Sequence, residues 1–362
     1  MSSSFVSHLE IIFPCFRKAC IRKQIRLTLD GIFHTIFSMK ALVTGGTGFI
    51  GSHLINHLLD EKNAEIFALV RDIENLKWLK GMKIHFLEGD LLSIPSLPTN
   101  IDYIFHIAGK TKARKVADYY TVNQHGTASF FSSLRAHKIE PQKIFYLSST
   151  AAAGPSFDGN PVKEDDEPHP VSAYGESKLL GEKEALRFKK DFPLVIIRVG
   201  AVYGPKDEDF LPYFKSIKKG ILLSQSSQKS TYHLCYIEDL IHAFDLCIAK
   251  DLASGEIINI ADPNHITWDE FGKAIGKILG KRPLTIRCPP LLLKTAAVVL
   301  EGAAAITNNP SNFNRDKLKA IMQANWLADI TKAQKLLSFS PRFSLEEGLS
   351  ETLAWYKDQD WL

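Results

Sequence analysis

The sequence predicts an α/β fold: a doubly wound parallel sheet followed by a smaller α/β domain. From Lys40 onward, short and nearly continuous apolar segments alternate with segments of helical periodicity, as in a parallel sheet covered by helices on both faces. A glycine-rich turn joins the first such segment to the next. The alternation ends after "VYGP" at 202–205. Residues 39–205 are therefore expected to form the doubly wound domain, and residues 206–362 a smaller domain that covers and binds the substrate.

Each element of the first domain has a sequence reason. Strands are expected where β-branched and aromatic residues form short apolar runs, and helices where apolar residues recur every three or four positions. The expected strands are 40–45, 65–72, 83–90, 101–109, 143–150 and 193–200, and the expected helices are 50–61, 118–138 and 172–190. In the second domain "EIINIAD" at 256–262 is a further strand, which is a candidate to return to the main sheet.

Composition excludes several classes of function. The formal charge of +4 comes without a basic stripe interleaved with aromatic residues, so nucleic-acid binding is not expected. The five cysteines are scattered and form no CxxC pair, which favours reduced thiols, a cytoplasmic location and no metal site. The longest apolar stretch, "PPLLLKTAAVVLEGAAAI" at 289–306, contains Lys294 and Glu301. We interpret it as a core or surface-packing helix rather than a membrane span.

The segment before the first strand has two interpretations. Residues 1–38 carry Arg17, Lys18, Arg22, Lys23 and Arg26 against only two acids. This basic, apolar-patterned stretch is similar to a targeting presequence or an interfacial helix. The alternative is that Met39 is the functional start and that the extension is dispensable, because a core strand begins at once with Lys40.

The glycine turn predicts a dinucleotide site. Gly46, Gly48 and Gly51 fit G-x-G-x-x-G between a strand and a helix, where glycines permit a tight turn and a close approach of backbone N–H groups to a pyrophosphate. The helix N-terminus adds partial positive charge. The candidate cofactor-binding residues of this turn are Gly45, Gly48, Phe49, Ile50 and Gly51.

The end of the second strand bears on which dinucleotide binds. An acid at this point would bind the ribose 2′-hydroxyl of NAD, whereas an arginine would accommodate the 2′-phosphate of NADP. The strand ends in "LVRD", with Val70 where an NAD-selective acid would point and Arg71 beside Asp72. Arg71 favours NADP, while Asp72 leaves NAD as the alternative and a solvated charged pair as a third interpretation.

A tyrosine, a lysine and a serine form a candidate catalytic unit. "YGESK" places Tyr174 and Lys178 one helical turn apart, so both side chains face the same way. Upstream, a strand ends in the hydroxyls of Ser148, Ser149 and Thr150, at the sheet edge where ligands bind. An ammonium group beside a phenol is expected to lower its pKa, and a serine hydroxyl can hold a carbonyl oxygen.

These motifs together resemble the extended short-chain dehydrogenase/reductase superfamily, also called NAD-dependent epimerase/dehydratase. The resemblance rests on "TGGTGFIG", Asp90 in "EGDLL", "HIAG" ending at Gly109, Asn123 in "VNQHGT", the serine run and Tyr174-x-x-x-Lys178. It covers about Lys40 to Pro205, with a weaker echo at "YHLCYIEDLIHAF".

The resemblance implies roles for individual residues. Tyr174 would be the catalytic acid/base, Lys178 would lower its pKa and hold the nicotinamide ribose, and Ser149 would supply the hydroxyl. Asp90 would meet the adenine, and Ala108 and Gly109 would line the cofactor cleft. Asn123 would fix the neighbouring helix, while His53 and His106 are expected to be structural. Family analogy also implies a homodimer packed through the helices at 119–137 and 174–189.

Two departures from the family pattern narrow the substrate. Thr150 and Ala151 stand where sugar dehydratases have an Asp-Glu pair, and Ala201 stands where epimerases have a diphosphate-binding asparagine. The chain is in this respect more similar to hydroxysteroid dehydrogenases and dihydroflavonol reductases, which implies an apolar ketone or secondary alcohol as substrate. A nucleotide-sugar epimerase is the alternative, and a non-catalytic dinucleotide-binding protein is a third hypothesis.

Overall fold

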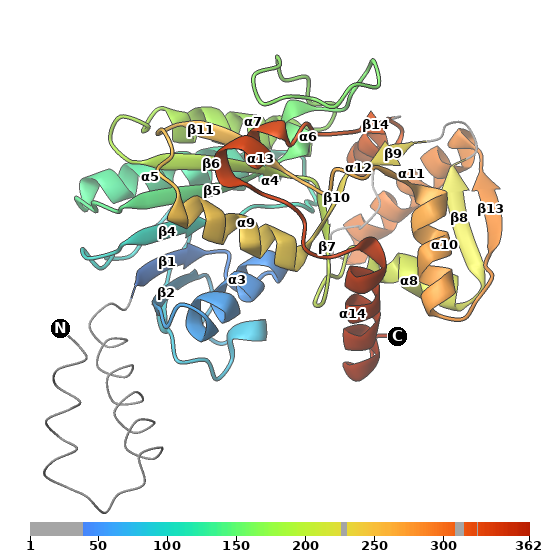
Figure 1. Ribbon diagram of the computed structural model, residues 1–362, viewed down its shortest axis with the longest axis horizontal. Helices are drawn as coiled ribbons and strands as arrows, with labels where there is room; N and C mark the ends of the chain where they lie inside the picture. The colour runs from blue at the N-terminus through green and yellow to red at the C-terminus, as the bar shows by residue number, and fades with distance from the viewer. Residues whose placement is uncertain (1–38, 226–229, 308–314, 324) are drawn as a thin grey trace, which may run out of the picture.

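The computed structural model describes residues 39–225, 230–307, 315–323 and 325–362. The prediction for residues 1–38 lies outside these described residues. Within them no helix combines the length and apolar character needed to cross a membrane. The chain has two parts in Figure 1, a layered sheet at the left and a group of helices and short strands at the right.

The predicted doubly wound parallel sheet is confirmed. It has seven strands in the order β3-β2-β1-β4-β5-β6-β11, and all neighbouring pairs are parallel. The strands are β1 (Lys40–Thr44), β2 (Glu65–Val70), β3 (His85–Glu88), β4 (Tyr103–His106), β5 (Lys143–Ser149), β6 (Leu194–Val199) and β11 (Glu256–Ile260). The last strand comes from the C-terminal half of the chain, so that half contributes an edge of the main sheet.

Helices cover both faces of this sheet because alternate residues of each strand point to opposite sides. In β1, Ala41 and Val43 pack in one core with α3 (Phe49–Asp60) and α9 (Ile237–Ala249), which lie in front of the strands in Figure 1. Leu42 packs on the other side, in a second core with α5 (Thr127–Ala136) and the end of α7 (Ala173–Leu186).

One predicted helix is interrupted. The stretch expected at 118–138 is divided into α4 (Ala117–Tyr120), a π-helical segment η2 (Thr121–Gly126) and α5. Such segments insert one residue into the helical ladder and occur frequently at functional sites. Here the insertion lies beside α7, which begins at the carboxyl edge of the sheet.

The second part of the molecule is built from short elements. Its helices are α8 (Leu211–Lys218), α10 (Trp268–Ile278), α11 (Pro290–Thr307), α12 (Arg315–Ile321) and α14 (Leu345–Asp358). Helix α13 (Thr331–Leu337) packs instead on β11 of the main sheet and on α9. Its paired strands are β7 (Ala201–Tyr203) with β10 (Leu234–Tyr236), β8 (Ile221–Gln225) with β13 (Leu284–Cys288), and β9 (Thr231–Tyr232) with both β12 (Ile266–Thr267) and β14 (Asn325–Trp326). The remaining short helices are η1 (Lys77–Leu79) and α6 (Thr150–Ala153).

Candidate active site

The structure brings Ser149, Tyr174 and Lys178 together at the carboxyl edge of the sheet. Ser149 is the last residue of β5 and caps α6, where its Oγ accepts a hydrogen bond of 3.1 Å from the Ala151 N–H. Tyr174 and Lys178 lie in the first turns of α7, which is capped by Ser172. The local sequence sets both positions. The apolar strand β5 ends in hydroxyl residues, and Ser172 caps the start of α7.

The hydroxyl of Tyr174 interacts with that of Ser149. Burial raises the pKa of Tyr174 to about 12, a hydrogen bond with Ser149 opposes the rise, and the negative charge of Asp209 and the nearby Tyr119 add to it. The Tyr119 ring also packs edge-on against the Tyr174 ring, with centroids 6.0 Å apart. Tyr174 is therefore a protonated phenol at neutral pH, and it is able to donate.

Lys178 is buried and its ammonium is already bonded. Its Nζ donates to the Leu147 carbonyl at 2.6 Å and lies 4.6 Å from the centroid of the Tyr146 ring. Burial lowers the pKa of Lys178 to about 8, although the carboxylate of Glu182 opposes this. The expected lowering of the Tyr174 pKa by Lys178 is not found: Lys178 is not among the groups that shift this pKa, and burial of the phenol raises it.

Beneath Lys178 lies a buried ion pair that the sequence analysis missed. Arg198 on β6 donates from Nε and Nη2 to the two carboxylate oxygens of Glu182 at 2.9 and 2.8 Å, and both side chains are 2% exposed. Ser148 donates to the same carboxylate at 2.5 Å. Two signals were present: Glu182 continues the four-residue spacing of Tyr174 and Lys178, and an arginine interrupts an apolar strand. The bond also commits Ser148 to the core, which leaves Ser149 as the hydroxyl beside Tyr174.

Asn123 holds the π-helical segment against α7, as expected of a positioning residue. Its Nδ2 donates to the Ser177 hydroxyl at 2.9 Å and to the Lys110 carbonyl at 3.0 Å, and its Oδ1 accepts from the Lys110 N–H at 2.7 Å. A Cβ at Gly181 would lie 2.4 Å from the Asn123 carbonyl oxygen. The two helices therefore touch through a glycine, and this close contact fixes the height of Lys178 above the sheet.

The glycine turn has the geometry that a dinucleotide diphosphate requires. Gly45 has a φ of +75°, and a Cβ there would lie 2.7 Å from the Ala108 N; at Gly51 a Cβ would lie 2.3 Å from the Gly45 oxygen. Helix α3 begins immediately after Gly48, which offers no side chain to cap it. The N–H groups of Phe49 and Ile50 are among those that a helix leaves without partners in its first turn, so they are available to phosphate oxygens.

The strand beside this turn supplies its second wall. Ala108 donates its N–H to the Thr44 hydroxyl at 3.2 Å, which also contacts His106 Nδ1 at 2.8 Å. His106 contacts the Thr127 hydroxyl through Nε2 at 3.1 Å, and burial lowers its pKa to about 3. His106 is therefore a neutral core residue. Gly109 is next to Asn123 and Lys178, since a Cβ there would lie 3.3 and 3.5 Å from their polar atoms.

The predicted adenosine-side residues lie at the ends of β2 and β3. Arg71 directly follows β2 and is exposed, and among the described residues it has no hydrogen bond or ion pair. The carboxylate of Asp72 accepts a hydrogen bond of 2.9 Å from the Glu74 N–H. Asp90 is exposed after β3, and its Oδ1 accepts from the Leu92 N–H at 2.9 Å. Arg71 is thus the side chain with the most freedom to meet a ligand.

His53 lies on the other side of the glycine turn and has a structural setting. Its Nε2 is 2.9 Å from the Pro205 carbonyl oxygen, and its Nδ1 is 3.3 Å from the Glu238 carboxylate. It links α3 to α9 and to the loop after β7, which agrees with the structural role expected for it.

A residue from far along the chain caps helix α7. The carboxylate of Asp316 on α12 accepts hydrogen bonds from the Ala173 N–H at 2.7 Å and the Tyr174 N–H at 3.2 Å. An acid at a helix N-terminus stabilises both unpaired N–H groups and the helix dipole. Asp209 lies nearby, paired with Lys112 and, at 3.8 Å, with Lys317. Nothing in the local sequence links Asp316 to Tyr174, which is 142 positions away.

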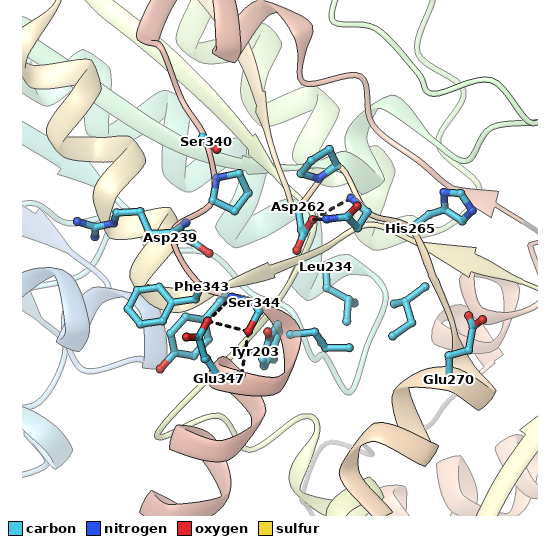
Figure 2. Close-up of a pocket in the computed structure, with 17 residues that line it drawn as sticks. Tyr203, Leu234, Asp239, Asp262, His265, Glu270, Ser340, Phe343, Ser344 and Glu347 are labelled. Atoms are coloured by element: carbon cyan, nitrogen blue, oxygen red, sulfur yellow. Dashed lines mark hydrogen bonds between the residues drawn. The ribbon is translucent and has the colours of Figure 1, made fainter. Parts of the chain in front are cut away.

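A separate cavity of about 670 Å³ lies in the second part of the molecule, at the start of α14 (Figure 2). None of the catalytic candidates lines it. Its acids serve local structure: Asp239 accepts from the Arg342 N–H, while Glu270 and Glu347 complete capping boxes of α10 and α14. Among the described residues no group of three or more acids, histidines or cysteines is arranged to bind a metal.

Known proteins resemble the chain over most of its length. A ceramide reductase of Caulobacter vibrioides is 27% identical over 326 residues, 88% of this chain and 95% of that protein. A decarboxylating sterol-4-alpha-carboxylate 3-dehydrogenase of Schizosaccharomyces pombe is 27% identical over 88% of this chain and 97% of that protein. The crystal structure of UDP-glucuronic acid 4-epimerase from Bacillus cereus, with UDP-glucuronic acid and NAD, is 26% identical, with a TM-score of 0.71 over 89% of this chain and all of that one.

The family model that matches is that of the NAD-dependent epimerase/dehydratase family, and it covers residues 41–261. This range includes the glycine turn, the serine run and Tyr174-x-x-x-Lys178, and it ends just after β11. The predicted relationship is therefore confirmed: the chain is an enzyme of the NAD-dependent epimerase/dehydratase family, within the extended short-chain dehydrogenases/reductases.

Proposed function

We propose that this enzyme interconverts an apolar ketone and the corresponding secondary alcohol, and that it prefers NADP(H). The observation that carries the proposal is the placement of Ser149 at the end of β5 next to Tyr174 and buried Lys178 on α7, at the sheet edge that also contains the glycine turn. A ketone oxygen bound between the two hydroxyls would receive a hydrogen bond from each.

The bound dinucleotide would be held by the N–H groups of Phe49 and Ile50 at its diphosphate and by Lys178 at its nicotinamide ribose, and it supplies or accepts the hydride. In the direction of ketone reduction Tyr174 donates the proton from Oη to the oxygen on which negative charge develops. A phenol with a pKa of about 12 carries this proton throughout the physiological range. Ser149 orients the carbonyl, and Asp316 holds the Tyr174 backbone in place.

The residues around the site favour reduction over sugar dehydration. Thr150 and Ala151 begin α6 directly after Ser149, and neither can act as a carboxylate acid or base. Ala201 on β7 likewise offers no amide for a diphosphate. By their names, two of the relatives reported above act on a ceramide and a sterol, which supports an apolar substrate for this chain.

The cofactor preference rests on Arg71. Its guanidinium is exposed at the end of β2, whereas the neighbouring Asp72 carboxylate already accepts a hydrogen bond in its own turn. A guanidinium pairs well with the 2′-phosphate that distinguishes NADP from NAD. NAD remains the alternative, because the structural relative from Bacillus cereus contains it. By family analogy we also propose that the chain forms a homodimer packed through residues 119–137 and 174–189.

A nucleotide-sugar epimerase is the second candidate, and the likeness to UDP-glucuronic acid 4-epimerase favours it. The two are separated by mass spectrometry of the cofactor that co-purifies with the chain, followed by a panel of apolar ketones and UDP-sugars. The proposal predicts turnover of a ketone that consumes added NADPH stoichiometrically. Conversion of a UDP-sugar without added cofactor, on tightly retained NAD, would establish the epimerase instead.

A further inference from the structure

The end of the molecule formed by β8, β13 and α11 exposes aliphatic side chains on two adjoining elements. We call this set the apolar end. On the two-stranded sheet, Ile221 is paired with Leu284 and Leu223 with Ile286, and all four are 37–70% exposed. Their strand neighbours Leu222 and Ser224 face inward against Gly272 and Asp269 of α10. The sheet therefore has a covered inner face and an apolar outer face.

β13 leads directly into α11, which continues the exposed set. Leu291, Leu292, Val298, Val299 and Leu300 are 46–73% exposed, whereas Ala297 is fully buried. A helix that is apolar on most of its sides is normally buried in a core or in a membrane, and contiguous exposed apolar surface of this kind marks an interaction site. The helix is not long and apolar enough to span a bilayer.

The charges around the apolar end are predominantly positive, and the sequence of α11 contains a single acid, Glu301. Residues 211–225 and 279–300 contain no aspartate or glutamate. Their seven cations are exposed and form no ion pairs among the described residues: Lys215, Lys218, Lys219, Lys281, Arg282, Arg287 and Lys294. Figure 1 shows β8 and β13 at the outer edge of the molecule, beyond α10 and away from the seven-stranded sheet. Exposed cations around aliphatic side chains match a bilayer that presents anionic headgroups over acyl chains.

Charge also argues against two other occupants of this surface, a second copy of the chain and residues 1–38. A second copy would bring seven further cations against these seven, and like charges across an interface oppose association. Residues 1–38 are also basic, with five cations between Arg17 and Arg26. We propose that the apolar end docks on a membrane surface containing anionic phospholipid, and that β13 and α11 insert their aliphatic side chains at the headgroup boundary.

The test is co-sedimentation of the full chain with phosphatidylcholine vesicles, with and without phosphatidylglycerol. No cofactor or substrate is added, so the result is independent of the reaction proposed above. We expect binding that requires phosphatidylglycerol. The triple variant Leu284→Ser/Leu291→Ser/Val299→Ser should lower the partition coefficient by about tenfold or more. The control Val116→Ser/Phe157→Ser/Leu336→Ser, which removes three exposed apolar groups elsewhere, should bind like the unmodified chain.

A second variant keeps the apolar side chains and removes charge. Arg282→Gln/Arg287→Gln/Lys294→Gln should weaken binding to phosphatidylglycerol vesicles and reduce its salt dependence. The proposal is overturned if the full chain does not sediment with either vesicle, or if both triple variants of apolar residues bind alike. It is also overturned if the unmodified chain is a dimer in sedimentation equilibrium that Leu284→Ser/Leu291→Ser/Val299→Ser converts to a monomer.

Discussion

The carboxyl edge of the main sheet and the apolar end differ in whether their charged side chains are paired. At the sheet edge, buried ionic groups are paired: Arg198 bonds both oxygens of Glu182, and the Lys178 ammonium bonds the Leu147 carbonyl. At the apolar end, cations such as Arg287 and Lys294 are exposed beside exposed leucines and form no ion pair with any residue that the structure describes. Pairing fixes side chains in one geometry, which catalysis needs, whereas unpaired surface charge acts on whatever approaches.

This difference indicates how strongly the stability of the fold depends on side chains in each region. The sheet edge depends on partners inside the chain, so losing one partner there leaves a buried charge uncompensated. The apolar end depends little on its own exposed side chains, because they contact few neighbours. Substitutions should therefore be costly in the first region and nearly neutral for folding in the second.

The largest expected effect is on turnover. Tyr174→Phe removes the proposed proton donor and should lower kcat by about 10³-fold, while dinucleotide binding measured by calorimetry stays within a few-fold of the unmodified enzyme. Tyr103→Phe is the matched control. Tyr103 begins β4, at the end of the strand opposite to the carboxyl edge, and its hydroxyl donates to Gln142. If cofactor binding is lost together with turnover, Tyr174 has a structural role instead.

The next effect is on folding. Glu182→Gln leaves the Arg198 charge buried without its partner and should reduce the free energy of unfolding by about 3–5 kcal/mol. Glu346→Gln removes the exposed pair with Lys277 in the second part of the molecule and should cost less than about 1 kcal/mol. Urea denaturation of both variants checks this contrast, and equal losses would remove the distinction between the two regions.

Much of the sheet edge could be predicted from the sequence because its determinants are local. Apolar runs give the strands, Gly45 and Gly51 mark the tight turn, and four-residue spacing joins Tyr174 to Lys178. The direction of the Tyr174 pKa could not be predicted, since it depends on burial created by the folded chain. Asp316 reaches Tyr174 only through tertiary structure.

The exposed surface of the apolar end could not be predicted from the sequence. The stretch at 289–306 was expected to pack as a core or surface helix, and its periodicity does not reveal which of its faces is covered. Only the structure reveals that Leu291 and Val299 are exposed. Likewise only the structure reveals the π-helical segment around Asn123 and the side-chain bonds of Asn123 to Lys110 and Ser177, which join segments separate in sequence.

A smaller effect concerns cofactor choice. Arg71→Ala should weaken NADP(H) binding by about 10- to 100-fold, the value of one charge-assisted contact to phosphate, and should change NAD(H) binding little. Asp72→Ala is the complementary variant, and it should leave NADP(H) binding within a few-fold. Dissociation constants from fluorescence titration decide the matter: equal losses for both cofactors in Arg71→Ala would remove the preference for NADP.

The smallest effect is on pH dependence. The pKa of Lys178 is lowered to about 8 by burial, so the ammonium is present below this pH and is lost as the pH rises through it. For ketone reduction kcat/KM should therefore fall above about pH 8, although Tyr174 keeps its proton to about 12. In Lys178→Arg the side chain stays charged, and the descending limb should disappear from the profile. If kcat/KM of Lys178→Arg still falls above about pH 8, a group other than Lys178 causes the fall.

The most direct measurement follows the transferred hydrogen. NADPH deuterated at the reactive position of its nicotinamide is incubated with the enzyme and an apolar ketone, and the product is analysed by mass spectrometry. The account predicts one deuterium on the carbinol carbon for each NADPH oxidised, and labelled product formed about 10³-fold more slowly by Tyr174→Phe. Labelled alcohol formed equally fast by Tyr174→Phe, or no transfer to any ketone from either NADPH or NADH, would contradict it.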